Sequence, residues 1–252
     1  MTRVAGTTVL VTGASSGIGR ATARTLAQRG ARLLVSGRDQ SRLDEVVRQT
    51  GALGCAVDLS TGDGPDQLTS WALGHGPVHS VVHSAGIGWS GPVHQASDSD
   101  VQRVLAVNVR APIQLTGRLL PPMLERGAGH LVFVGSIAGL LGVPEESAYA
   151  ASKAALHGYA RSLAVEVAQS GVEVSIVAPG VVNTGFFQRR GTPYRRRFPR
   201  PIPAERVATA IADAVEHDRA EVIVPAWLRV PVLLQAAAPT LYHRLASRSA
   251  GG

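Results

Sequence analysis

Residues 7–19 read TTVLVTGASSGIG, and this stretch decides the fold. An apolar, β-branched run ends at Thr12, and a turn with Gly13, Gly17 and Gly19 follows at once, after which apolar residues recur at helical spacing. Glycines at a strand-to-helix turn tolerate positive φ, and the unpaired N–H groups of the helix N-terminus attract phosphate. The spacing differs from G-x-G-x-x-G, and a tight turn that binds nothing has the same glycines. The stretch predicts a strand, a turn and a helix, with a phosphate site as one interpretation of the turn.

Short apolar runs and helical segments alternate along the whole chain. The runs are apolar on both faces, as parallel strands covered by helices on each side would be. Helical segments such as GRATARTLAQRG carry apolar residues three and four positions apart. We therefore predict one α/β domain over residues 1–225, a doubly wound parallel sheet of about seven strands, followed by an apolar tail over 226–252. The seven runs are TTVLVTG, ARLLVSG, LGCAVDL, VHSVVHS, GHLVFVGS, VEVSIVAPG and AEVIVP.

Composition limits the class of protein. With 252 residues, 45% of them hydrophobic and 17% charged, the chain is long enough for one large domain with a buried core. The lone Cys55 excludes an intrachain disulfide and a cysteine metal site, which favours a reducing compartment. The N-terminal apolar run is too short for a signal peptide, and no segment approaches the roughly 20 apolar residues of a membrane-spanning helix. We expect a cytoplasmic globular protein without a transmembrane segment.

The net charge of +7 is concentrated in one segment, QRRGTPYRRRFPR, residues 188–200. Such a cluster is one signature of nucleic-acid binding, but a basic loop that faces an anionic ligand or solvent explains it more simply. We therefore expect no nucleic-acid partner.

The end of the second strand bears on which dinucleotide such a fold would bind. An acidic residue there would hydrogen-bond a free ribose 2′-hydroxyl, but VSGRD places Gly37 and Arg38 at this point. A guanidinium forks onto phosphate, so Arg38 favours NADP over NAD, unless it is one surface arginine among many. Asp58 ends the third strand in AVDLS and either accepts a hydrogen bond from the adenine amino group or caps the next helix.

Lys153, in SAYAASKAALHGY (147–159), is the only lysine in the chain. Tyr149 precedes it by one helical turn, and Ser136 ends a strand at the ligand-binding edge of the predicted sheet. A cation about 4 Å from a phenol contributes roughly 4 kcal/mol at an effective dielectric of about 20, which lowers a phenol pKa near 10 by up to about 3 units. We therefore expect Lys153 to bring Tyr149 close to the pH at which acid–base catalysis is efficient.

With these residues identified, the sequence resembles the short-chain dehydrogenase/reductase family over roughly residues 6–225. TGASSGIG matches the family's TGxxxGIG cofactor turn, and YAASK matches its YxxxK motif, with Ser136 thirteen residues before Tyr149. Asn108 in AVNVRAP matches the asparagine of the catalytic tetrad, and PGVVNT (179–184) matches the segment around the nicotinamide. The resemblance implies a Rossmann-type enzyme that moves hydride between NADP(H) and a ketone or secondary alcohol without a metal.

The same resemblance implies a role for each matched residue. Tyr149 exchanges a proton with the substrate oxygen, and Ser136 holds and polarises that oxygen. Lys153 lowers the pKa of Tyr149 and binds the nicotinamide ribose, while Asn108 holds a water that links Lys153 to solvent. The implied cofactor contacts are Gly13, Ser15, Ser16, Gly17, Ile18, Gly19, Arg38, Asp58, Leu59, Ala85, Gly86, Tyr149, Lys153, Pro179, Gly180, Val182 and Thr184.

Two positions depart from the family pattern. Where the family has NNAG after its fourth strand, this chain has His83, Ser84, Ala85 and Gly86, so the amides that tie neighbouring strands are replaced and local stability is in question. We expect His83 to be a hydrogen-bonded structural histidine rather than an extra acid or base. Ser16 stands where some NADP-dependent relatives carry a basic residue, so the choice of NADP rests mainly on Arg38.

The segment 185–202 corresponds to the family's substrate lid, and its aromatics are interleaved with arginines. It suits either an anionic ketone such as an acyl thioester, held by Arg195 and Arg196, or a neutral lipophilic ketone under a basic surface loop. We consider three roles for the tail, in order of preference: a wall of the substrate pocket, an oligomer contact and a peripheral membrane contact.

The long helical patterns near 98–125 and 147–169 are those that form dimer contacts in the family, so we expect a homodimer or homotetramer. The alternative functions are an NAD-dependent secondary-alcohol dehydrogenase and a sensor or scaffold that binds nucleotide without turnover.

Overall fold

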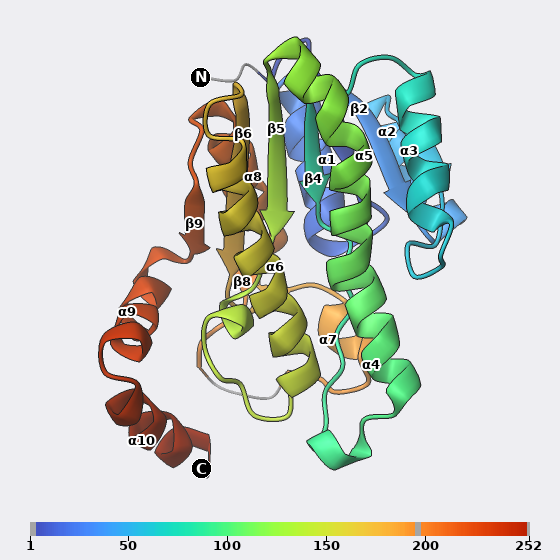
Figure 1. Cartoon of the computed structure of the whole chain (residues 1–252). Coiled ribbons are helices and arrows are strands. Elements are labelled where there is room, and N and C mark those ends of the chain that lie inside the picture. Colours follow the sequence, from blue (N-terminus) through green and yellow to red (C-terminus); the bar gives the residue numbers. More distant parts are fainter. Residues whose placement is uncertain (1–3, 195–197, 251–252) are drawn as a thin grey trace.

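A seven-stranded, all-parallel sheet forms the centre of the protein in the computed structural model, which describes residues 4–194 and 198–250 (Figure 1). Its order is β3-β2-β1-β4-β5-β6-β9. The chain runs outward from β1 in one direction and then restarts beside it at β4, so the doubly wound prediction is confirmed. The strands are β1 Thr8–Val11, β2 Arg32–Gly37, β3 Leu53–Ala56, β4 Ser80–His83, β5 Gly129–Val134, β6 Val172–Pro179 and β9 Glu221–Val224.

Helices cover both faces of the sheet. On one face pack α1 Gly17–Gln28, α2 Gln40–Thr50 and α8 Ala204–Glu216, which share a core cluster with the side chains of the central strands. On the other face pack α3 Gly64–Gly74, α5 Ala111–Arg126 and α6 Ser147–Glu166. The central strands are buried on both sides, which explains why their sequences are apolar throughout.

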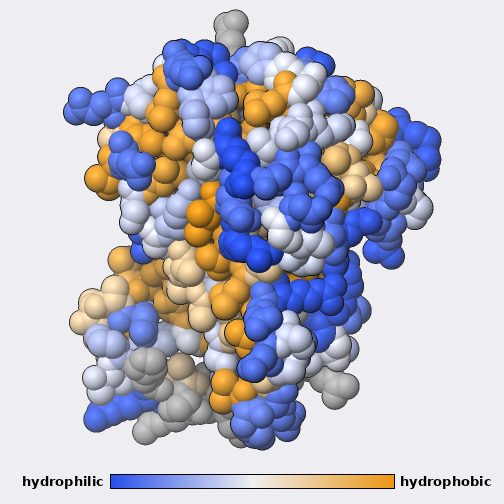
Figure 2. Space-filling model, turned by 45° about the vertical axis from the view of Figure 1, so that its right-hand side comes forward, coloured by the Kyte–Doolittle hydropathy of each residue, from blue (hydrophilic) through white to orange (hydrophobic). Residues whose placement is uncertain are grey.

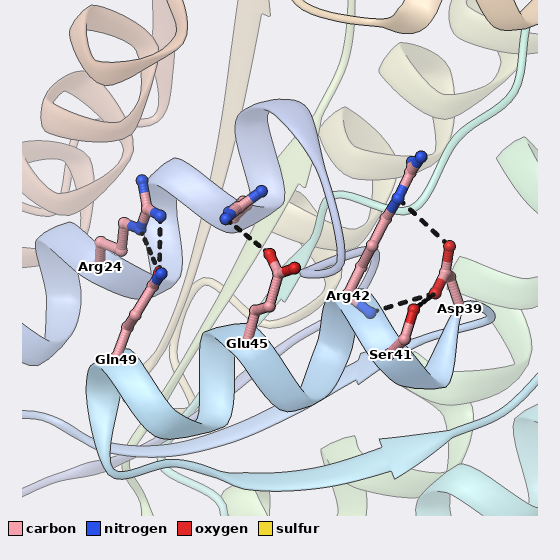
Figure 3. Close-up of polar contacts among 7 residues, drawn as sticks. Arg24, Asp39, Ser41, Arg42, Glu45 and Gln49 are labelled. Carbon is pink, nitrogen blue, oxygen red and sulfur yellow. Dashed lines mark hydrogen bonds and ion pairs between the residues drawn. The ribbon is translucent and has the colours of Figure 1, made fainter.

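Polar contacts fix α2 beside α1 (Figure 3). Arg20 of α1 forms a 3.0 Å ion pair with Glu45, and Arg24 donates two hydrogen bonds to the side-chain oxygen of Gln49. Asp39 caps α2 by accepting a hydrogen bond from the main-chain N–H of Arg42. The contacts of Arg20 and Arg24 hold the middle and the end of α2 against α1.

The predicted long helix near 98–125 is a run of three helical segments. A capping box between Ser97 and Asp100 begins α4 (Asp98–Leu105), a π-helical turn follows over Ala106–Arg110, and α5 continues from there. Asn108 lies in the π-helical turn and is fully buried. Single π turns within α-helices often mark functional sites.

Two features at the carboxyl edge were not predicted as separate elements. A short parallel pair, β7 (Val182–Asn183) and β8 (Ile202–Pro203), brackets the lid, and its helix α7 spans Phe186–Arg189. The tail forms a 3-10 turn (Ala226–Leu228), α9 (Arg229–Ala237) and α10 (Pro239–Ala250), which project from the sheet below β9 (Figure 1). Among the described residues, no helix has the length and apolarity needed to cross a bilayer.

Candidate active site

A cavity of about 800 Å³ opens at the carboxyl ends of the strands, between the glycine turn and α7. It brings together residues that lie far apart in the sequence, and among the predicted site residues that the structure describes, Asn108 alone does not line it. The predicted residues in its wall are Gly13, Ser15, Ser16, Gly17, Ile18, Gly19, Arg38, Asp58, Leu59, Ala85, Gly86, Ser136, Tyr149, Lys153, Pro179, Gly180, Val182 and Thr184.

The glycine turn needs its glycines for space as well as for backbone angles. Gly13 has φ +68°, and a Cβ there would lie 2.7 Å from the Cα of Ala85. Gly17 has φ +55° and begins α1, whose N-cap Ser16 makes no side-chain capping hydrogen bond. The first N–H groups of α1 therefore face the cavity without a side-chain cap, as a phosphate site requires.

The hydroxyl of Thr12 ties β1 to the residues after β4. Its Oγ1 accepts hydrogen bonds from the main-chain N–H groups of Ser84 (3.1 Å) and Ala85 (3.0 Å). This contact fixes Ala85 beside Gly13 without any side-chain amide at positions 83 and 84.

His83 is a structural residue, as predicted. Its ring is 2% exposed, stacks on Phe133 with centroids 4.8 Å apart, and lies with Nε2 3.2 Å from the hydroxyl of Thr116. Burial lowers its pKa to about 3, so the imidazole is neutral at physiological pH.

At the end of the cavity next to the glycine turn, arginines and carboxylates lie in pairs. Arg38 Nη1 lies 3.8 Å from Asp58 Oδ2, and Arg42 Nε lies 3.3 Å from Asp39 Oδ2 (Figure 3). Asp58 caps the turn at Ser60, whereas α3 begins after Asp63, so the helix-cap interpretation of Asp58 was wrong. Burial acts to raise the pKa of Asp58, but hydrogen bonds from Ser60 and the charge of Arg38 outweigh it and lower that pKa.

Arg42 and Arg189 also line this end, and sequence reasoning missed both. The pKa of Arg189, which comes from α7, is lowered by burial and by the charges of Arg42 and Arg38. The three arginines outnumber the two carboxylates here, so the end of the cavity next to the glycine turn is positive overall. Arg42 lies in the first turn of α2, which follows Arg38 directly in the sequence.

Ser136, Tyr149 and Lys153 meet in the middle of the cavity wall. Ser136 follows β5, and its Oγ accepts a hydrogen bond of 3.1 Å from the N–H of Ala138. Tyr149 and Lys153 lie one turn apart on α6 and are 9% and 5% exposed. Lys153 Nζ donates to the main-chain oxygen of Val134 at 2.9 Å and lies 5.9 Å from the ring centroid of Tyr149.

The expected lowering of the tyrosine pKa is wrong for this structure. Burial is the main cause that raises the pKa of Tyr149 to about 12, and the charge of Glu146 acts in the same direction. Hydrogen bonding with Ser136 and the charge of Arg190 act to lower this pKa. Burial also lowers the pKa of Lys153 to about 8. The sequence argument counted the attraction of a nearby cation and omitted the larger cost of burying a phenolate.

Asn108 lies behind the cavity wall. Its Oδ1 accepts from the N–H of Ile87, and its Nδ2 donates to the main-chain oxygen of Ile87 and to Ser152 Oγ, each at 2.9 Å. Its side-chain amide is therefore engaged by protein groups, and the water expected at Asn108 stays a prediction. Its visible role is to fix the chain after Gly86 against α6.

Aromatic rings from the predicted lid segment line the cavity. Phe186 packs on Tyr149 with centroids 5.5 Å apart, and Phe187 contacts both Phe186 (5.6 Å) and Tyr194 (5.3 Å). Arg190 forms a 2.6 Å ion pair with Glu146, so this lid arginine is paired with the protein itself. Arg195 and Arg196, which were expected to hold an anionic substrate, lie outside the described residues.

Comparison with known proteins agrees with this geometry. The short chain dehydrogenase family model matches residues 7–194. Dehydrogenase/reductase SDR family member 7B of Danio rerio is 38% identical over 190 residues, which cover 71% of this chain and 62% of that protein.

Two solved structures share the fold. A short-chain dehydrogenase from Sphingobium yanoikuyae in complex with NADPH has a TM-score of 0.81 and 25% identity, covering 97% of this chain and 94% of that one. A short-chain dehydrogenase/reductase from Burkholderia phymatum in complex with NAD has a TM-score of 0.87 and 28% identity, covering 96% of each chain. From the family match over three quarters of its length, the chain belongs to the short-chain dehydrogenase/reductase family of NAD(P)-dependent oxidoreductases.

Proposed function

We propose that the protein is an NADP(H)-dependent enzyme that interconverts a lipophilic ketone and its secondary alcohol, working chiefly as a reductase. One observation carries this proposal: Ser136, Tyr149 and Lys153 line the same cavity as the uncapped N-terminus of α1 and the Arg38 end. A hydroxyl, a phenol and an ammonium are thus placed beside a dinucleotide-sized groove.

The residues present fit a dinucleotide phosphate. The N-terminus of α1 would hold the pyrophosphate, and Arg38 with Arg42 would hold a ribose 2′-phosphate. Gly37 leaves the strand end without the carboxylate that would repel this phosphate. The structural neighbours hold NADPH in one case and NAD in the other, so the preference for NADP depends on the arginines of this chain.

When bound, the nicotinamide supplies the hydride, and the protein supplies the proton. A Tyr149 with a pKa of about 12 is protonated at neutral pH, so it carries the proton that a ketone oxygen takes up when it becomes a hydroxyl. Ser136 would donate a hydrogen bond to the same oxygen and hold it near the phenol. Lys153, whose pKa is about 8, lies on the same helix and titrates near the working pH.

The lid favours an apolar substrate. Phe186, Phe187 and Tyr194 line the cavity next to Tyr149, and Phe198 and Trp227 stack with centroids 5.1 Å apart at its outer part. The charge of Arg190 is already paired with Glu146, so Arg190 does not favour an anionic substrate group. A lipophilic carbonyl compound is therefore the substrate class that we propose.

The test is to follow NADPH and NADH consumption while a panel of aliphatic ketones, aromatic ketones and acyl thioesters is offered. We expect NADPH-dependent turnover of the lipophilic ketones, with little turnover of the acyl thioesters. Turnover confined to NADH, or to anionic substrates, would contradict the proposal.

A homo-oligomer belongs to the same proposal. Leu105 of α4, Ile113 and Leu124 of α5 and Val165 of α6 are 42%, 37%, 41% and 80% exposed. Figure 2, in which the right-hand side of Figure 1 is turned forward, shows hydrophobic patches among hydrophilic residues on this part of the surface. Light scattering coupled to size exclusion would give the mass of a dimer or tetramer, and a Val165→Glu variant would shift it towards the monomer.

A further inference from the structure

Arg190 and Glu146 form a buried ion pair between the lid and the catalytic helix. Arg190 follows α7, and Glu146 is the N-cap residue of α6, three residues before Tyr149. Arg190 Nη1 lies 2.6 Å from Glu146 Oε1, and the two side chains are 5% and 15% exposed. Across the pair, the lid is joined to a segment 44 residues earlier in the chain.

The guanidinium also organises the lid aromatics. Its Cζ lies 4.7 Å from the ring centroid of Phe187 and 5.9 Å from that of Phe186. Phe186 in turn packs on the ring of Tyr149. A single side chain therefore connects Glu146 to the ring that covers the phenol, through an ion pair and two cation–π contacts.

Neither charge has an obvious part in the reaction itself. Burying two charges costs free energy that their attraction offsets only with good geometry, and removing one partner leaves the other charge buried and unpaired. Solvent-exposed residues would fasten a lid at lower cost. The pair lies where both charges act on the phenol of Tyr149, and this position calls for an explanation.

The charged groups around the phenol come from three elements. Lys153 lies on the same helix, Glu146 precedes that helix, and Arg190 follows α7, while the neutral hydroxyl of Ser136 comes from the end of β5. Glu145 and Tyr194 line the same cavity. Glu146 raises the pKa of Tyr149 and Arg190 lowers it, so the two effects oppose each other while the pair is intact.

We propose, on the basis of the function proposed above, that Arg190 and Glu146 are positioning residues whose ion pair fastens α7 over the substrate and at the same time balances the electric field at the Tyr149 hydroxyl. Opening of the lid separates the two charges and leaves Glu146 alone beside the phenol. Proton donation by Tyr149 is thereby matched to the closed lid.

The experiment compares Glu146→Gln, Arg190→Gln and the double variant in pH profiles of kcat and kcat/KM. We expect Glu146→Gln to move the limb that reports Tyr149 to lower pH and Arg190→Gln to move it to higher pH, with the double variant close to the wild type. Each single variant should also raise KM, because the lid is released. Arg190→Lys keeps the charge without the fork, so we expect it to raise KM while keeping the wild-type pH profile.

If the ion pair only fastened the lid and had no electrostatic role, both single variants would raise KM, and their pH profiles would coincide with that of the wild type. That result, or shifts of the same sign, would overturn the proposal. Arg118→Gln is the control for the loss of one arginine charge, because Arg118 of α5 pairs with Asp66 of α3 at an exposed place away from the cavity.

A second readout separates this proposal from the proposed function. Tyrosinate absorbance can be titrated in each variant and in its Tyr149→Phe counterpart, and the difference reports Tyr149 without any substrate. Opposite shifts in this titration support the proposal even where no ketone in the panel is reduced. Identical titrations in all variants overturn it, even where turnover with NADPH is confirmed.

Discussion

Lys153 Nζ donates a hydrogen bond of 2.9 Å to the main-chain oxygen of Val134, the last residue of β5. The sole lysine is therefore held against the strand that leads to Ser136, and its charge lies 5.9 Å from the ring centroid of Tyr149. Burial lowers the pKa of Lys153 to about 8 and raises that of Tyr149 to about 12. As pH rises, Lys153 loses its proton well before Tyr149 does.

The first prediction concerns this order of titration. Because Lys153 is the only lysine, protein grown with ¹⁵N-labelled lysine gives one side-chain nitrogen resonance. We expect its chemical shift to titrate with a midpoint near 8. A midpoint near the ordinary lysine value of about 10.4 would mean that the ammonium is hydrated and is not held at Val134.

The second prediction separates the phenol hydroxyl from its ring. Tyr149→Phe keeps the ring that contacts Phe186 but removes the proton donor, so we expect kcat to fall by about 10²- to 10⁴-fold. Binding of NADPH, followed by its fluorescence, should change little. Tyr159→Phe is the control on the same helix, since that ring packs edge-on against Phe133 in the core. Equal loss in both variants would argue for a structural role of the hydroxyl.

The fold was predictable because its signals are local. Each strand is a short apolar run, and each helix keeps its apolar residues on one side, so the period of the pattern identifies both. The order of the strands follows from the doubly wound pattern. The π-helical turn at Asn108 has no such signal, because nothing in AVNVRAP distinguishes it from the α-helix on either side.

The candidate site was predictable in its membership and much less so in its electrostatics. Motif spacing identified Ser136, Tyr149 and Lys153, which do line one cavity. The pKa of Tyr149 depends on the burial of the ring and on the charges of Glu146 and Arg190. The spacing of the motif residues reveals neither the burial nor the two charges. The partner of Arg190 lies 44 residues away in the chain, so no local pattern pointed to the pair.

The third prediction concerns the positive end of the cavity. Arg38→Ala should weaken binding of NADPH by about 10- to 100-fold and leave binding of NADH nearly unchanged, since only NADPH carries the 2′-phosphate. Arg42→Ala should have the same sign and a smaller effect, because Arg42 lies closer to its carboxylate, Asp39 at 3.3 Å (Figure 3), than Arg38 does to Asp58 at 3.8 Å. Arg24→Ala removes an equal charge from α1 at a site that contacts Gln49, and it controls for net charge. Equal weakening of both cofactors by Arg38→Ala would place the phosphate elsewhere.

The fourth prediction is a loss of stability in mild acid that comes from buried histidines. Burial lowers the pKa of His83 to about 3, and it lowers those of His130 and His157 to about 4. The charge of Asp218 acts to raise the pKa of His130. The charge of Glu221 and the main chain of Ser136 act to raise the pKa of His157, but burial outweighs these effects for both rings. In the unfolded chain these rings titrate near 6.5, so the unfolded state binds more protons than the folded state between that pH and the folded values.

The sign of the effect follows from this difference in proton binding. The stability that comes from these neutral histidines is fully present above pH 6.5. It falls as the pH drops towards 4, by up to about 1.4 kcal/mol per pH unit for each histidine. Thermal unfolding followed by circular dichroism from pH 7.5 to pH 4.5 should therefore show a Tm that falls steadily below about pH 6.5. His130 lies fully buried with Nε2 2.8 Å from Ser175 Oγ. His130→Gln should therefore make the fall of Tm with pH less steep, by the contribution of about one titrating proton. His94→Gln changes an exposed ring and should leave the slope as it is. A Tm that does not change across this range would mean that the buried rings take up protons as readily as those of the unfolded chain.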